Sequence, residues 1–338
     1  MSRRRPELSP AWRPVASLMA LLPLAGCGGG SAPGIAGGGD GGNAIMLAHA
    51  QAIWLDAGTI VWPGADAAHG YKLYYSSGAS LAPGVSDISG SDDPGGVVLA
   101  SGTLTAAQRA AYPQYAGAIA LMVPAGTAAQ AAALLRDQLA VVQYSGSMVT
   151  GGTQLQIGPV LDSLYGAAAA GIPLGVAFDA TTDAPTFRLW APTASSVQLE
   201  VYANAAAQSA VSVSMTADPS SGVWSYTAAD ASWTNTAYYT YSVRVFSRAA
   251  ASVAGYGAVV TNIVTDPYAV TLNGDSTRAM VVNLADGVAT PAGWPGALPA
   301  TGATPTDSVI YELHVRDFSA NDASVPAAHQ GKFLAFSD

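Results

Sequence analysis

The 338-residue sequence has few charged side chains and almost no cysteine. Only 10% of its residues are charged, and 13 basic against 22 acidic residues give a formal net charge of −9. An acidic surface repels phosphate backbones, so nucleic acid is excluded as a general partner. The single cysteine, Cys27, excludes an internal disulfide and any metal site built from several cysteines.

Long apolar runs are also missing. Although 50% of the residues are hydrophobic, no run of 18 or more unbroken apolar residues follows residue 30, which argues against a membrane-spanning helix there. His49, His69 and His329 lie far apart and lack the spacing of a metal-binding motif. The 37 glycines and 21 prolines are typical of turn-rich β structure. We therefore expect a mainly β protein without metal or cofactor.

Residues 1–26 have the layout of a secretory signal peptide. Three arginines at 3–5 precede a short apolar stretch at 15–24, and small residues lead to Cys27. This Leu-Ala-Gly-Cys ending resembles the lipobox of bacterial lipoproteins, in which the thiol is diacylated. The resemblance implies an extracytoplasmic protein held to the outer membrane or cell surface through Cys27, with the glycine-rich residues 27–43 as a tether. The alternative is an ordinary signal peptide with an incidental cysteine.

Residues 44–165 combine short strands with two helical stretches. The segments 53–55, 59–62 and 71–75 are rich in β-forming residues and are separated by Gly and Pro turn signals. One short helix is expected over 105–112, with Thr105 as its N-cap. A second, Ala/Leu-rich helix is expected over 127–142, and its buried side should carry three leucines: Leu134, Leu135 and Leu139.

Residues 172–290 carry a cleaner β pattern. Val197, Leu199 and Val201 alternate with polar residues, and the same alternation recurs over 211–216 and 239–245. Strict period-two patterning indicates strands with one buried and one solvent-facing side, as in a β-sandwich. A Pro/Gly/Ala-rich linker is expected over 291–307.

Several segments resemble debranching enzymes of glycoside hydrolase family 13. The Phe-Arg-Leu-Trp-Ala-Pro-Thr-Ala run from Phe187 and the later segment 222–226 resemble carbohydrate-binding module family 48, the isoamylase-type N-terminal β-sandwich. Residues 52–76 are similar to the extra N-terminal β domain of bacterial pullulanases. The run from Val309 to Ser319, Val-Ile-Tyr-Glu-Leu-His-Val-Arg-Asp-Phe-Ser, resembles the first strand of their catalytic barrel. The resemblance covers the chain from about residue 50 onward, in the family order.

Together these features predict two β-sandwich-type domains in tandem, followed by the first strand of an incomplete (β/α)8 barrel at 308–338. A barrel of this kind needs about 250 residues. The family carries its catalytic carboxylates on later barrel strands, and no position of this sequence matches them. We therefore expect the N-terminal part of a pullulanase-type debranching hydrolase, inactive by itself.

Two groups of acidic residues are candidate chemical sites. Glycoside hydrolysis needs two facing carboxyl groups, but Glu312 and Asp317 are offset by five residues and would point to opposite sides of a strand. A hydrogen-bonded structural role is expected for the polar trio of Glu312, His314 and Arg316. The acidic run 87–93 suggests a calcium loop but lacks the glutamate of the EF-hand pattern, which favours a solvated turn.

Aromatic residues in the second β domain are the candidate binding groups. Glucan-binding modules stack aromatic rings on the apolar face of a sugar and bind its hydroxyls through polar groups. The candidates are Trp224, Trp233, Tyr226 and Tyr239, of which the two tryptophans are favoured. Core packing is the alternative for each, and Trp190 is expected in the core. The expected partner is an α-glucan such as pullulan, starch or glycogen.

Two other functions remain open from the sequence. One is a non-catalytic α-glucan-binding lipoprotein, which is all that these residues could be alone. The other is an adhesion-type sandwich lipoprotein unrelated to sugars, against which the barrel-like segment ending at Phe318 argues.

Overall fold

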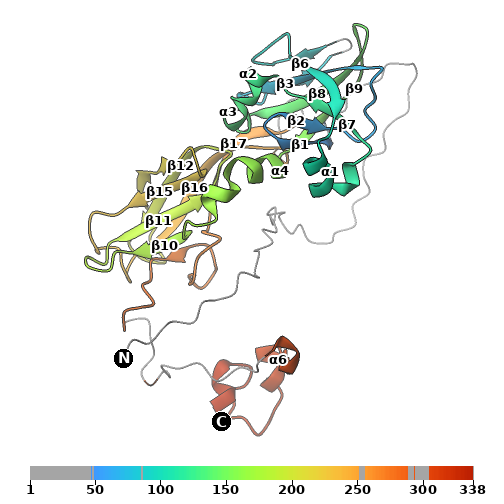
Figure 1. The fold of residues 1–338 in the computed structure, drawn as a ribbon. Coiled ribbons are helices and arrows are strands. Elements are labelled where there is room, and N and C mark those ends of the chain that lie inside the picture. The colour runs from blue at the N-terminus through green and yellow to red at the C-terminus, as the bar shows by residue number, and fades with distance from the viewer. Residues whose placement is uncertain are drawn as a thin grey trace, which may run out of the picture. The chain divides into compact units, whose positions relative to one another are not determined.

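The computed structural model describes Leu47 and residues 49–84, 87–250, 256–287, 293 and 304–337. The predicted signal peptide, Cys27 and the tether lie outside the described residues. The chain divides into two compact units, Met1–Ala289 and Thr290–Asp338. The first unit contains a closed barrel and a β-sandwich (Figure 1).

The barrel contains seven strands in the closed order β1-β2-β7-β6-β3-β8-β9. The strands are β1 (Ala50–Asp56), β2 (Thr59–Val61), β3 (Gly70–Ser76), β6 (Val97–Thr103), β7 (Ile119–Met122), β8 (Gln138–Ser145) and β9 (Met148–Gln156). Closure comes from the parallel pairing of β1 with β9, in which Ala52 lies opposite Leu155. A small hairpin of β4 (Ala82–Pro83) and β5 (Ile88–Ser89) lies outside the barrel.

The first domain is therefore a barrel, and its prediction as a sandwich was wrong. The three predicted strands are present as β1, β2 and β3. Alternation of apolar residues is shared by both architectures, and only the distant pairing of β1 with β9 separates them. Trp54, Ile60, Tyr71 and Leu73 fill the barrel core.

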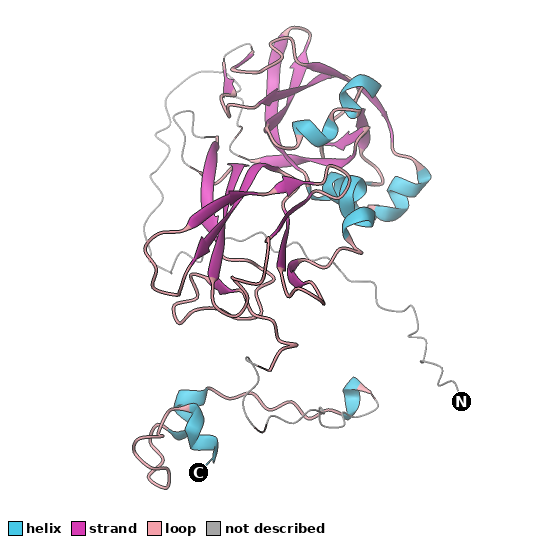
Figure 2. Cartoon of the chain, turned by 90° about the vertical axis from the view of Figure 1, so that its left-hand side faces the viewer, coloured by secondary structure: helices cyan, strands magenta, loops and turns pink. Residues whose placement is uncertain are grey.

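Short helices flank the barrel strands (Figure 2). They are α1 (Ala106–Ala111), the 3-10 turn η1 (Pro113–Tyr115), α2 (Ala125–Ala128), α3 (Ala131–Leu134), α4 (Gly158–Leu161), the π-helical η2 (Asp162–Gly166) and α5 (Ala167–Ala169). The expected cap of α1 is confirmed, because the Thr105 side chain accepts from Gln108 N at 3.2 Å and the Gln108 side chain accepts from Thr105 N at 2.8 Å. This is a complete capping box.

The predicted helix over 127–142 was wrong in its second half. The helical residues end at Leu134, and Gln138–Ser145 form strand β8 between β3 and β9. Helix propensity is a weak preference that sheet pairing on both sides overrides. The three leucines expected on a buried side are nevertheless all buried.

The second domain is a two-sheet β-sandwich, as predicted. One sheet has the order β10-β11-β15-β14, and the other has the order β13-β12-β16-β17 with β18 beside β16. The strands are β10 (Gly175–Phe178), β11 (Pro185–Trp190), β12 (Ala194–Tyr202), β13 (Val211–Ser214), β14 (Thr216–Ala217), β15 (Val223–Thr227), β16 (Tyr238–Ser247), β17 (Ala258–Val264) and β18 (Ala279–Met280). Val197, Leu199 and Val201 point into the core, as the alternation requires.

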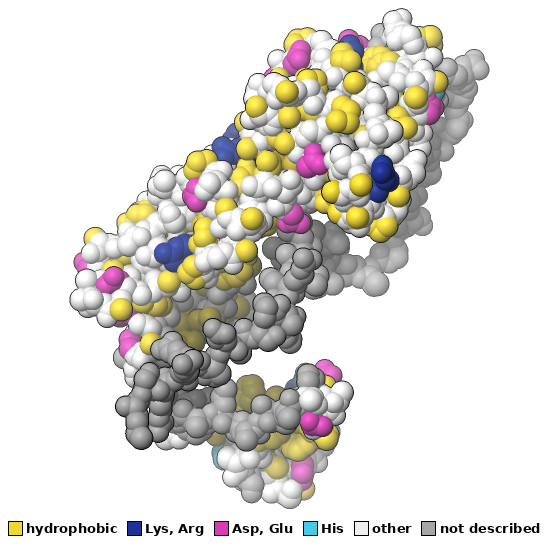
Figure 3. Space-filling model, in the orientation of Figure 1, with side chains coloured by type: hydrophobic (Ala, Val, Ile, Leu, Met, Phe, Trp, Pro, Cys, Tyr) yellow, Lys and Arg dark blue, Asp and Glu magenta, His cyan; other side chains and the backbone are white. Residues whose placement is uncertain are grey.

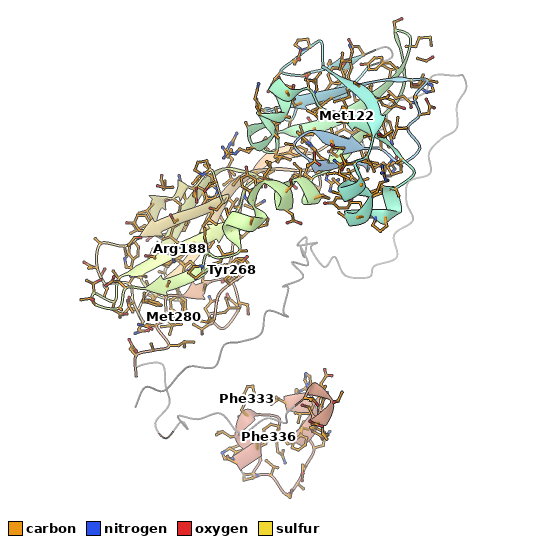
Figure 4. All side chains as sticks on the ribbon, viewed as in Figure 1. Met122, Arg188, Tyr268, Met280, Phe333 and Phe336 are labelled. Carbon is orange, nitrogen blue, oxygen red and sulfur yellow. The ribbon has the colours of Figure 1, made fainter. Side chains whose placement is uncertain are left out.

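One side chain outside the strands closes the edge of this sandwich. Tyr268 lies over Gly175, where an added Cβ would come within 3.0 Å of the Tyr268 side chain. Gly175 also has a φ of +85°, which a residue with a side chain rarely adopts. Tyr268 is labelled on the sandwich in Figure 4 together with Arg188 and Met280.

The second unit contains only short helical segments among its described residues. They are η3 (Pro305–Asp307), α6 (Val315–Ser319) and η4 (Phe333–Ser337). The predicted strand over 308–318 was wrong, because residues 308–314 have no regular structure and α6 follows them. A lone strand leaves its backbone groups unpaired, and no described strand lies within this unit to pair with it.

Candidate functional site

Trp233 lies in the turn before β16 and is partly buried against the sandwich core. Its ring stacks on Tyr226 of β15, with centroids 6.0 Å apart and planes 29° apart. Phe187, which is fully buried, contacts Trp233 edge-on at 6.2 Å. The core side chain thus fixes the orientation of a two-ring stack, and a fixed and partly exposed indole suits the apolar face of a sugar.

A network of polar side chains includes Asn235, two residues after Trp233. The Asn235 amide donates to the Asp286 carboxylate, and its carbonyl oxygen accepts from Asn283 N at 2.9 Å. The Asn283 amide in turn donates to Asp183 Oδ1 at 2.6 Å. This polar network joins three loops beside the ring stack and presents amide and carboxylate groups of the kind that bind sugar hydroxyls.

The polar network includes two unusual backbone conformations. Asp183 and Asn235 have φ values of +56° and +58°, and neither is glycine. Asp and Asn tolerate this left-handed conformation better than most residues, but it still has a cost that the surrounding hydrogen bonds must offset. Thr234 contributes such a bond by donating to the Asp183 carbonyl at 2.8 Å. The network was missed from the sequence, because its members come from three separate loops.

Trp224 is much less accessible than Trp233. It is 8% exposed, belongs to the sandwich core and donates from Nε1 to the Ala191 carbonyl at 2.9 Å. A ring buried to this degree offers a sugar much less surface than the ring of Trp233, so the geometry supports Trp233 more strongly than Trp224. Trp190, expected in the core, is partly buried and packs against the barrel cluster.

Asp266 is a buried carboxylate inside the sandwich. It is 4% exposed and accepts from the hydroxyls of Tyr239 at 2.7 Å and Tyr241 at 3.4 Å, and from Tyr268 N at 2.8 Å. Burial raises the pKa of this carboxyl, although the three donors act in the opposite direction. Its surroundings are those of a structural group that links the core to the chain leaving β17.

The polar residues singled out in the second unit are all exposed. Glu312, His314, Arg316 and Asp317 are part of this unit, and the side chains of His314 and Asp317 are 70% and 73% exposed. His314 caps α6 by accepting from Asp317 N at 3.4 Å. The geometry is that of a local helix cap.

The acidic run 87–93 forms turns through its carboxylates. Asp92 accepts from Ser77 N at 2.8 Å, and Asp93 accepts from Gly95 N at 3.1 Å. Across the described part of the chain, no group of three or more His, Cys, Asp or Glu side chains is arranged to hold a metal ion. The described helices also include none that is long and apolar enough to cross a membrane.

Comparison with known proteins identifies both domains of the first unit. Residues 49–163 match the Pullulanase N2 domain, and residues 173–269 match carbohydrate-binding module 48, the isoamylase N-terminal domain. The pullulanase of Klebsiella pneumoniae is 32% identical over 297 residues, which cover 86% of this chain and 26% of the relative. The chloroplastic pullulanase 1 of Arabidopsis thaliana is 32% identical over 295 residues, with 86% and 29% covered.

A solved structure agrees with these matches. The crystal structure of Klebsiella pneumoniae pullulanase complexed with maltotriose superposes with a TM-score of 0.74 at 32% identity, covering 87% of this chain and 27% of that one. The chain thus spans about a quarter of the length of the relatives that it matches. With a region that matches the Pullulanase N2 domain followed by one that matches carbohydrate-binding module 48, the chain is homologous to the N-terminal part of pullulanases.

Proposed function

We propose that this chain is the glucan-binding N-terminal part of a hydrolase that cuts α-1,6 branches in pullulan, starch or glycogen. Two family matches in the order found in pullulanases support the proposal, together with relatives named pullulanase. The hydrolytic activity is that of the whole enzyme, and the first unit contributes substrate binding.

The observation that carries the binding proposal is the ring stack of Trp233 on Tyr226 beside the polar network. The stack lies within a domain that matches a carbohydrate-binding module, and a similar enzyme was crystallised with maltotriose. A stacked indole supplies contact area, and the amides and carboxylates of Asn235, Asn283 and Asp183 supply hydrogen bonds.

Retardation in amylopectin-containing native gels tests this site. Removing a stacking ring costs about 1–3 kcal/mol of binding, by analogy with base–aromatic stacking, so Trp233→Ala should weaken amylopectin binding about fivefold or more. Its melting temperature should change far less than that of Trp224→Ala, because truncating a buried tryptophan costs about 3–5 kcal/mol of stability. Trp224→Ala is therefore the reference for the loss of stability that truncating a buried tryptophan causes. Wild-type retardation in Trp233→Ala would contradict the site, and a chain never retarded would contradict glucan binding.

We also propose that Cys27 is acylated and holds the protein to a membrane outside the cytoplasm. The Leu-Ala-Gly-Cys ending of the short apolar segment supports this proposal. Labelling cells with a clickable fatty acid should mark the wild type and leave Cys27→Ser unlabelled. Equal labelling of the two proteins, or none of either, would exclude the anchor.

A further inference from the structure

A groove of about 220 Å³ lies between the barrel and the sandwich within the first unit. Ala133, Arg136 and Tyr165 line it from the barrel helices and the turn after α3. Pro192, Asp218 and Trp224 line it from the sandwich. Both domains of the first unit therefore contribute to the groove. Neither ring of the Trp233 stack lines it, so the groove and the stack are separate sites.

Arg136 is the least satisfied charged group in this groove. Its Nε is buried and has no hydrogen-bond partner among the described residues. A buried donor without an acceptor costs free energy. The positive charge of Arg136 also acts on Tyr165, where it opposes the rise in the pKa of that hydroxyl caused by burial. Arg136 and Tyr165 therefore lie close together in the groove wall.

Asp218 provides a fixed negative group in the opposite wall. Its carboxylate accepts from the hydroxyls of Ser220 at 2.7 Å and Ser221 at 2.6 Å, and these bonds lower the pKa of Asp218. The turn that holds it packs tightly, since a Cβ added to Gly222 would come within 2.6 Å of the Pro192 side chain. Asp218 thus stays ionised and is held in one position.

The wall combines these two charged groups with aromatic surface. Trp224 and Tyr165 are both largely buried, and both line the groove. Arginine donates and carboxylate accepts, whereas each sugar hydroxyl can do both. Charged side chains are scarce on the face that Figure 3 shows, where the basic and acidic groups are isolated from one another.

The size of the groove limits what it can hold. Sites for drug-sized ligands measure about 300–1,000 Å³, so 220 Å³ suits a single glucosyl unit. We propose that this groove binds the end of an α-glucan chain, one glucosyl unit deep, as a second glucan site that barrel and sandwich share. This inference rests on the proposed glucan-binding function and adds a site specific for chain ends.

Maltotriose, which has chain ends, and α-cyclodextrin, which has none, distinguish the two sites. Calorimetric titrations should use the full chain carrying Trp233→Ala, so that the ring stack does not contribute. This protein should bind maltotriose and fail to bind α-cyclodextrin. Adding Arg136→Met or Ala133→Leu should weaken maltotriose binding at least tenfold.

Ala133→Leu fills the groove from an exposed helical position and should not impair folding. Ala129→Leu is its matched control, because Ala129 is also exposed and does not line the groove. Equal maltotriose binding in Ala133→Leu and Ala129→Leu would overturn the groove site, as would the absence of any binding in the Trp233→Ala background. Either result would leave the amylopectin retardation of the wild type, and with it the proposed function, unaffected.

Discussion

The barrel and the sandwich each place two tyrosine hydroxyls around one aspartate, with different exposure. In the barrel, Tyr74 donates to Asp87 at 3.2 Å, and the hydroxyls of Tyr74 and Tyr144 lie 2.5 Å apart. Asp87 itself is exposed. In the sandwich, Asp266 is buried, and its donors have no access to alternative partners in water. Buried tyrosines therefore hold an exposed carboxylate in one domain and a buried carboxylate in the other.

Replacing each aspartate by alanine tests this contrast and should give the largest effect. Asp266→Ala leaves buried tyrosine hydroxyls without an acceptor, at a cost of about 3 kcal/mol or more, which corresponds to a fall of roughly 10 °C in melting temperature. Asp87→Ala should cost about 1 kcal/mol or less, because water can replace the exposed carboxylate. Scanning calorimetry measures both. Equal losses would show that burial does not separate the two clusters.

The capping box of α1 is a second difference between the domains, because the described residues of the sandwich contain no helix. Thr105→Ala should destabilise the chain by about 1 kcal/mol. Gln108→Ala should cost more, because the Gln108 amide also donates to Asp56 at 2.7 Å and Thr59 at 2.9 Å. Urea unfolding gives both values. A larger loss for Thr105→Ala would contradict the role of Gln108 in fastening α1 to the strands.

Asp137 in the barrel should have the smallest effect on stability, and this effect should depend on pH. Burial and, to a smaller extent, the charge of Asp92 raise the pKa of Asp137, Arg136 lowers it, and the net result is a pKa of about 6. The folded state therefore holds the proton more tightly than the unfolded state, in which the pKa is about 4. Stability should fall as pH rises from about 4 to 6 and then level off.

The variant Asp137→Asn removes this pH dependence. Because the side chain is half exposed, the expected gain at pH 7.5 is about 1 kcal/mol or less, with no gain at pH 4. Thermal melts at the two pH values provide the measurement. A gain of the same size at both would assign the effect to packing and exclude ionisation.

The sequence predicted those features that depend on interactions between residues close together in the chain. Strand positions at Val197, Leu199 and Val201 follow from alternation, and the Thr105 cap follows from side-chain chemistry within one turn of helix. The errors came from distant pairing. Residues 138–142 have helix-forming composition but form strand β8, because β3 and β9 pair with it on both sides.

The same distinction between local and distant interactions applies to the candidate site. Trp233 could be chosen from its turn-like flanks, and its partly exposed ring stack supports the choice. Trp224 looks similar in sequence, and only the packing of β15 against Ala191 shows that it is buried. The polar network of Asp183, Asn235 and Asn283 spans about 100 residues, so no local pattern identifies it.

The parallel pairing of β1 with β9 also determines how long β1 must wait for its partner strand during synthesis on the ribosome. About 100 residues separate Ala52 from its partner Leu155. At roughly 5–20 residues per second, the ribosome takes about 5–20 s to add them. Throughout this interval the apolar β1 has an unpaired edge, which is prone to aggregation. Slower translation of β9 would lengthen the exposure of nascent β1, and the yield of folded protein should fall with it.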